Sequence, residues 1–250
     1  MKNNFYIFLI ALGLTGCQSQ IIRPTFEYAS TSLGVYNSGL LNVGQLFVWD
    51  MRENTLTRLD EIPFPSTPTS KTTPTTLVAS NISSVEFSAG IDSAVKANAS
   101  AAIRDNVSIQ VQNGSREEYR STISLLANEI NRKKAVGEDV DNGWLLRRAA
   151  ENGSYLRYVI IRGLVTSDKA ELIAKNTSGG ELALVIPGGK GGNVKVDLSK
   201  EALASCTGSS SPCFLSFQVL KAYYNTNGNY DFEPVRGVRT SQIADLLKTM

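Results

Sequence analysis

Ser93 and Lys96 come nearest to a catalytic pair in this chain of 250 residues. Residues three apart are neighbours on one face of a helix, so the lysine amine would lie beside the serine hydroxyl. A serine beside such a base can act as a nucleophile in acyl transfer. A lysine followed by two glycines at 190–192 faintly matches a second motif of such enzymes, but no Ser-Asp-Asn segment lies between the two. We favour an ordinary helix surface and keep a serine hydrolase using Ser93 and Lys96 as an alternative.

The chain contains no histidine, which excludes Ser-His-Asp and Cys-His arrangements and removes the commonest zinc ligand. The acidic stretch 138–143 does not fit a calcium-binding loop. Counted from Asp139, Gly143 takes the fifth place instead of the sixth, and Ala150 takes the place of the final glutamate. The glycine-rich stretch 188–192 lacks the serine or threonine that follows a phosphate-loop lysine, and it predicts a hairpin loop. We therefore expect no metal and no cofactor.

Charge and aromatic content say little about partners. The formal net charge of +2 gives no electrostatic reason to expect a nucleic-acid partner. Trp49, Trp144, Tyr223 and Tyr224 could line a binding surface, because aromatic side chains are enriched at interfaces. The alternative for these four residues is a place in the core.

The N-terminus predicts export. Lys2 in a short polar start is followed by an uncharged run of apolar or small residues from Phe5 to Leu14. This run is shorter than the about 20 apolar residues that a transmembrane helix needs, so it indicates a signal peptide over residues 1–16. The stretch that follows, Leu14-Thr15-Gly16-Cys17, resembles the lipobox of bacterial lipoproteins.

This resemblance implies that the Cys17 thiol receives a diacylglyceryl group, that the chain is cut before Cys17, and that the new amino group is acylated. Membrane lipid would then be the first partner, since several acyl chains together anchor a protein stably. In this class an aspartate after the cysteine favours retention in the inner membrane. Gln18 instead implies the outer membrane, facing the periplasm, or the cell membrane in a Gram-positive host.

Cys206 and Cys213 are the only cysteines left once Cys17 carries lipid. An exported chain meets oxidising conditions, so we expect a disulfide between them. The alternative, a redox-active dithiol, fits less well because such sites favour two intervening residues and these cysteines have six.

Helices and strands are mixed along the rest of the chain. Helices are predicted over 93–105 with Asp92 as cap, from a Ser115–Glu118 capping box to near Gly137, over 142–151, and from Thr240 or Ser241 onward. Strands are predicted over 44–50, 55–59, 84–88, 107–111, 155–165, 171–175, 181–186, 194–198, 214–224 and 230–235. Asn227-Gly228 predicts a type I′ turn between the last two strands.

These elements predict an α+β fold: a mixed, largely antiparallel sheet with two or three packed helices and a C-terminal helix. Residues 1–16 form the predicted signal peptide, and residues 17–62 the lipidated cysteine, a tether and a small β segment. Residues 63–81, rich in proline and threonine, are a linker or a long loop, and residues 82–250 the α+β domain.

The sequence thus leads us to expect a membrane-anchored, periplasm-facing lipoprotein. We expect a non-catalytic binding or assembly component of an envelope structure, such as a secretion, pilus or transport apparatus, with an envelope protein as partner. The envelope serine hydrolase, and a surface-exposed lipoprotein that binds a ligand or a host, are the alternatives.

Overall fold

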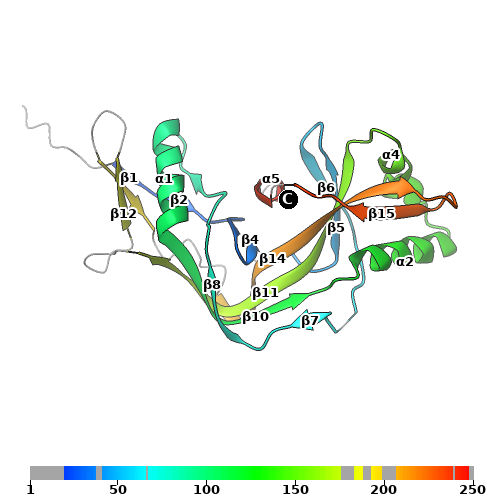
Figure 1. The fold of residues 1–250 in the computed structure, drawn as a ribbon, viewed down its shortest axis with the longest axis horizontal. Coiled ribbons are helices and arrows are strands. Elements are labelled where there is room, and N and C mark those ends of the chain that lie inside the picture. The colour runs from blue at the N-terminus through cyan, green and yellow to red at the C-terminus, as the bar shows by residue number, and fades with distance from the viewer. Residues whose placement is uncertain are drawn as a thin grey trace, which may run out of the picture.

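The computed structural model describes residues 20–37, 41–65, 67–175, 183–187, 193–198, 207–238 and 240–247. Figure 1 shows an elongated molecule in which three long strands, β10, β11 and β14, connect two ends. The small end contains α1 with strands β1, β12 and β13. The large end contains strands β5, β6 and β15 with helices α2 to α5.

The strands are β1 Gln20–Ile22, β2 Pro24–Thr25, β3 Ser30–Thr31, β4 Gly34–Tyr36, β5 Gln45–Asp50, β6 Thr55–Glu61, β7 Ser70–Lys71, β8 Thr75–Ala79, β9 Glu86–Phe87, β10 Val107–Glu118, β11 Leu156–Ala174, β12 Ala183–Pro187, β13 Asn193–Asp197, β14 Thr207–Tyr224 and β15 Tyr230–Pro234. The helices are α1 Ser93–Asn106, α2 Thr122–Ala135, α3 Val140–Gly143, α4 Leu146–Ala150 and α5 Thr240–Leu247.

A 10-stranded sheet forms the frame of the molecule, in the order β3-β4-β14-β11-β10-β7, with β5, β6, β8 and β15 branching from it. Every pair in this sheet is antiparallel, whereas β1 and β13 pair in parallel in a separate 3-stranded sheet. The predicted α+β class, with a mixed and largely antiparallel sheet and a C-terminal helix, is confirmed.

At the large end both faces of the sheet are covered, which explains why its strands are apolar without alternation. Leu46, Val48 and Tyr158 pack with α2, α3 and α4 on one face. Phe47 and Val159, their neighbours in the chain, point to the other face, where α5 packs. A strand buried on both faces reads as a continuous apolar run, as residues 45–49 do.

At the small end the sheet alternates between buried and partly exposed residues. Val107, Ile109 and Val111 are buried under α1, while Ser108 and Gln110 between them are partly exposed. Asp92 caps α1 as predicted, its carboxylate accepting the backbone N–H of Ala94 at 2.8 Å.

The predicted helix start at Ser115–Glu118 is wrong, because these residues extend strand β10 and α2 begins only at Thr122. Asn113 adopts a left-handed φ of 51°, and the register of β10 against β8 shifts there. Beyond this irregularity, residues 115–118 pair with residues 163–166 of β11. A capping box stabilises a helix by about 1 kcal/mol, which the pairing with a long central strand outweighs.

Two further boundaries differ from the prediction. The helix expected over 142–151 is two short helices, because Leu145 takes a left-handed φ of 56° between them. The strands expected over 155–165 and 171–175 are one continuous strand, β11, since β10 and β14 pair with its polar middle from both sides.

The β14–β15 hairpin forms as predicted, but its turn type differs. Gly228 has a positive φ of 74°, whereas Asn227 is not in the left-handed region that a type I′ turn requires. The Gly228 N–H donates to the Asn225 carbonyl at 2.9 Å, which closes a four-residue turn that ends in a left-handed glycine.

The region predicted as an N-terminal segment and a linker contributes strands to the main sheet. β5 pairs with β11 over residues 46–50, and β6 pairs with β5. The proline- and threonine-rich stretch carries β7 and β8, which pair with β10. Residues 1–16 and Cys17 lie outside the described residues.

Candidate functional site

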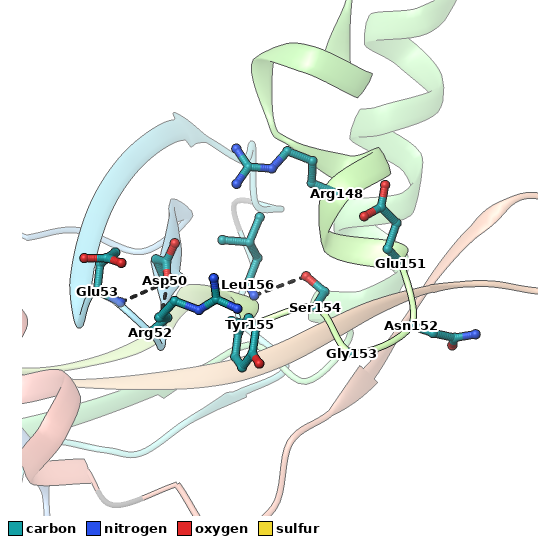
Figure 2. Close-up of a pocket in the computed structure, with 10 residues that line it drawn as sticks. All are labelled: Asp50, Arg52, Glu53, Arg148, Glu151, Asn152, Gly153, Ser154, Tyr155 and Leu156. Atoms are coloured by element: carbon teal, nitrogen blue, oxygen red, sulfur yellow. Dashed lines mark hydrogen bonds between the residues drawn. The ribbon is translucent and has the colours of Figure 1, made fainter.

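A surface cleft of about 440 Å³ lies at the large end, where β11 begins. One wall is the turn between β5 and β6, and the other is the end of α4 with the turn that leads into β11 (Figure 2). Its lining residues are Asp50, Arg52, Glu53, Arg148, Glu151, Asn152, Gly153, Ser154, Tyr155 and Leu156.

Backbone hydrogen bonds hold both walls in place. The Asp50 carboxylate accepts the N–H groups of Arg52 at 2.9 Å and Glu53 at 3.1 Å, which closes the β5–β6 turn. The Met51 N–H donates to the Tyr155 carbonyl at 3.0 Å and so joins the two walls. Such bonds fix the spacing of the cleft without using the groups that face solvent.

Arg52 and Tyr155 form the centre of the cleft (Figure 2). The Arg52 guanidinium carbon lies 4.1 Å from the centroid of the Tyr155 ring, within the range of a cation–π contact. Its interaction with the Tyr155 side chain raises the pKa of Arg52 above the ordinary value. Although it stacks with Arg52, Tyr155 is 51% exposed, so most of the pair is available to a partner.

The cleft contains charges of both signs. Arg52 and Arg148 supply positive charge, and Asp50, Glu53 and Glu151 supply negative charge. The Ser154 hydroxyl accepts the Leu156 N–H at 3.2 Å, and this is its hydrogen bond within the described residues. The arrangement suits recognition of a polar surface with mixed charge, and its parts do not form a nucleophile with an adjacent base.

The predicted pair Ser93 and Lys96 lies away from this cleft, on α1 at the small end. Ser93 is the exposed first residue of α1, and Lys96 is half-buried beside β9. Within the described part of the chain, no hydrogen bond joins the two side chains or brings a third group to them. The structure brings neither of them to the cleft.

The acidic stretch 138–143 is used in structural contacts. Asp139 caps α3 by accepting the Asn142 N–H at 3.1 Å. Glu138 pairs with Lys133 at 2.7 Å, and Asp141 pairs with Lys134 at 2.9 Å. Over the described ranges, no group of three histidine, cysteine, aspartate or glutamate residues could hold a metal ion.

The aromatic residues that the sequence singled out lie mostly in the core. Trp49 and Trp144 are buried, Tyr223 is half-buried and only Tyr224 is exposed. Sequence reasoning missed Tyr155, because it was assigned to the start of a strand. The turn signal Asn152-Gly153 just before it is the feature that could have indicated an exposed position.

The cysteine predictions fall largely outside the described residues, which include neither Cys17 nor Cys206. Cys213 is buried, and its Sγ lies 2.9 Å from the Ser167 Oγ. The hairpin loop predicted at 188–192 also lies outside the described residues, but its flanking strands β12 and β13 pair antiparallel. Lipidation of Cys17 and the Cys206–Cys213 disulfide stay predictions.

Among the described residues, no helix combines the length and the apolar character needed to cross a membrane. No protein-family model matches the chain, and no curated protein matches it significantly. Among solved structures, it is similar to a bacterial gasdermin from Bradyrhizobium tropiciagri, with 10% identity, 84% of this chain and 87% of that chain covered, and a TM-score of 0.33. A likeness this slight carries no argument about function.

Proposed function

We propose that this protein is a lipid-anchored, periplasm-facing lipoprotein that acts as a non-catalytic binding or assembly component of an envelope structure. Cys17 is the lipid attachment point, and the cleft around Arg52 and Tyr155 is the contact surface for an envelope protein. The outer membrane is the expected location, from Gln18 after the lipidated cysteine.

The observation that carries this proposal is the separation between the N-terminal strand and the cleft. β11 begins at Leu156 in the cleft and ends at Ala174, which pairs with Val107 directly after α1. At about 3.3 Å per residue, its path is roughly 60 Å long. β1, only three residues after Cys17, belongs to the sheet beside α1, so a frame of long strands stands between anchor and cleft (Figure 1).

The chemistry of the cleft supports a protein partner. A small-molecule site is usually a mostly apolar cavity that encloses its ligand, whereas this cleft is open and lined mainly by charged and polar groups. An exposed tyrosine stacked with an arginine is instead typical of a protein contact, because both residue types are enriched where binding energy concentrates.

Photo-cross-linking from the cleft tests the proposal. A photoreactive amino acid at position 155 of the full chain, expressed in its own host, should give a discrete cross-link to one envelope protein. Tyr224, also exposed and near the same end of the molecule, provides the matched control position. Arg52→Glu combined with Arg148→Glu should remove the cross-link from position 155.

Three outcomes would count against the proposal. If positions 155 and 224 gave the same cross-linked products, the cleft would have no specific partner. Protease access to the chain on intact cells would favour the surface-exposed alternative. Labelling by a serine-reactive probe that Ser93→Ala abolishes would favour the hydrolase alternative.

A further inference from the structure

The 3-stranded sheet at the small end has one face in the core and one face in solvent. Its inward residues Ile22, Val194 and Ile186 are buried and pack in the same cluster as α1. Because side chains alternate along a strand, the residues between them point outward. The outward face has no described element over it in Figure 1.

An apolar pair flanks a lysine on this outward face. Ile21 of β1 pairs with Lys195 of β13, which pairs in turn with Val185 of β12, so the three lie in one row across the sheet. Val185 is 68% exposed and Ile21 is 58% exposed. Next to this row, Arg23 forms an ion pair with Asp197 at 3.0 Å, and its side chain remains 73% exposed.

We propose that this outward face lies against the lipid headgroups of the membrane in which Cys17 is anchored. The inference rests on the proposed function, because it requires lipid on Cys17. Only Gln18 and Ser19 stand between Cys17 and β1. Three Cα–Cα steps span at most about 11 Å, so a lipidated Cys17 holds β1 at the bilayer surface.

The composition of the face fits lipid headgroups. Isoleucine and valine side chains can enter the boundary between headgroups and acyl chains. Arg23 pairs with Asp197 through its Nε, and the aliphatic stem of this exposed arginine lets the rest of its guanidinium reach lipid phosphates. A stable protein interface buries roughly 800 Å² on each partner. One row with two apolar residues is a small patch by that measure, which favours lipid over a protein partner on this face.

The contact would set the orientation of the whole molecule. With the outward face of β1, β12 and β13 on the bilayer, β11 leads away from the membrane toward the cleft. The membrane contact and the proposed partner contact then occupy opposite ends, and neither blocks the other (Figure 1).

Fluorescence quenching by a lipid-bound quencher tests whether the outward face contacts lipid headgroups. Val185→Cys and Val136→Cys are a matched pair, because both valines are exposed, at 68% and 66%, and Val136 lies at the end of α2 at the large end. Each variant is expressed from the full chain, purified in its lipidated form and labelled with the fluorophore. It is then placed in vesicles of phosphatidylethanolamine and phosphatidylglycerol that carry a quencher at headgroup depth. We expect quenching at position 185 to exceed that at position 136 by about threefold or more, since only the former would contact headgroups.

Substitution of the apolar pair supplies the second measurement. With the probe on Asn193→Cys, an exposed position that shares the outward face because it lies two residues before Lys195 in β13, Ile21→Ser with Val185→Ser should reduce quenching, while Val136→Ser should leave it unchanged. Equal quenching at positions 185 and 136 overturns the proposal, and so does unchanged quenching in the double-serine variant.

Palmitate labelling separates this inference from the proposed function. In one outcome the protein incorporates palmitate and Cys17→Ala does not, but quenching is equal at positions 185 and 136. This outcome supports the lipid anchor and contradicts only the contact between the outward face and the membrane. Absence of palmitate from the unaltered protein overturns both.

Discussion

Tyr158 links the core of the large end to the wall of the cleft. Its hydroxyl donates to the Trp144 carbonyl at 2.7 Å, and its ring meets Phe232 edge-on at 5.6 Å between centroids. Trp144 stands just before Leu145 and α4, which supplies Arg148 to the cleft and is followed there by its C-cap Glu151. Burial raises the pKa of Tyr158 far above its ordinary value, so the hydroxyl keeps its proton and stays a donor.

We therefore expect Tyr158→Phe to lower the free energy of unfolding by about 1–2 kcal/mol, because it leaves a buried carbonyl without its donor. Tyr155→Phe is the control: it keeps the ring under Arg52 and should change stability by less than about 0.5 kcal/mol, as exposed substitutions do. Urea denaturation followed by circular dichroism measures both. Equal stability of the two variants would contradict the role assigned to Tyr158.

Lys133 connects α2 to two other segments of the large end. Its Nζ lies 2.9 Å from Asp60 of β6 and 2.7 Å from Glu138 in the turn before α3. Burial alone would raise the pKa of Asp60, but hydrogen bonds from Lys133 and the Glu61 N–H outweigh it and hold this pKa below its ordinary 3.8. The hydrogen bonds to Glu138 and Asp60 raise the pKa of Lys133.

The sign of the pH dependence follows from the lowered pKa of Asp60. Its contribution to stability is fully present above the unfolded-state value of 3.8 and is lost as pH falls through the folded-state pKa. We expect Lys133→Met to cost about 1 kcal/mol near neutral pH, allowing for solvent screening. The difference from the unaltered protein should shrink as pH falls below 3.8.

Urea denaturation of both proteins across that pH range measures the effect. Lys221→Met, which removes an exposed pair with Glu233 at 3.4 Å, should cost less at every pH. A constant difference between Lys133→Met and the unaltered protein from neutral to acid pH would show that the ion pairs of Lys133 do not stabilise the fold.

The elements that the sequence predicts well are those whose signals are local. The helix over 93–105 has its own cap in Asp92, and the C-terminal helix places Ile243, Leu246 and Leu247 in the core as its spacing predicts. The segment 115–118 has an equally good local signal for a helix, yet its pairing partner lies far along the chain at 163–166. Local patterns do not reveal that competition.

The cleft could not be predicted for the same reason. Its two walls, residues 50–53 and 148–156, are about a hundred residues apart in the chain. They meet because β5 pairs with the first residues of β11, Leu156 with Asp50 and Arg157 with Trp49. The exposure of Tyr155 and the position of Arg52 above its ring are consequences of that pairing.

At the scale of the whole molecule, β11 and β14 run through more than one packed cluster. Ile103, Leu172 and Phe214 belong to the cluster at the small end. Tyr158 and Leu220, further along β11 and β14, belong to a cluster at the large end. Because the same strands supply both clusters, loss of packing at one end should be transmitted to the other.

Substitution at the small end, observed at the large end, tests this coupling. Both tryptophans, Trp49 and Trp144, are buried at the large end, so their fluorescence reports on that end alone. Ile103→Ala opens a cavity under α1 and should cost about 2–5 kcal/mol. If the long strands unfold as one unit, the tryptophan transition moves to lower urea together with the circular-dichroism transition.

Ile173→Ala provides the matched control, because Ile173 is also at the small end but is 39% exposed on the outer face of β11. It should shift both transitions only slightly. A tryptophan transition that stays in place in Ile103→Ala, while circular dichroism shows a separate earlier step, would mean that the two ends unfold independently. The frame of long strands could not then act as a rigid spacer between a membrane anchor and the cleft, and the proposed function would lose its main structural support.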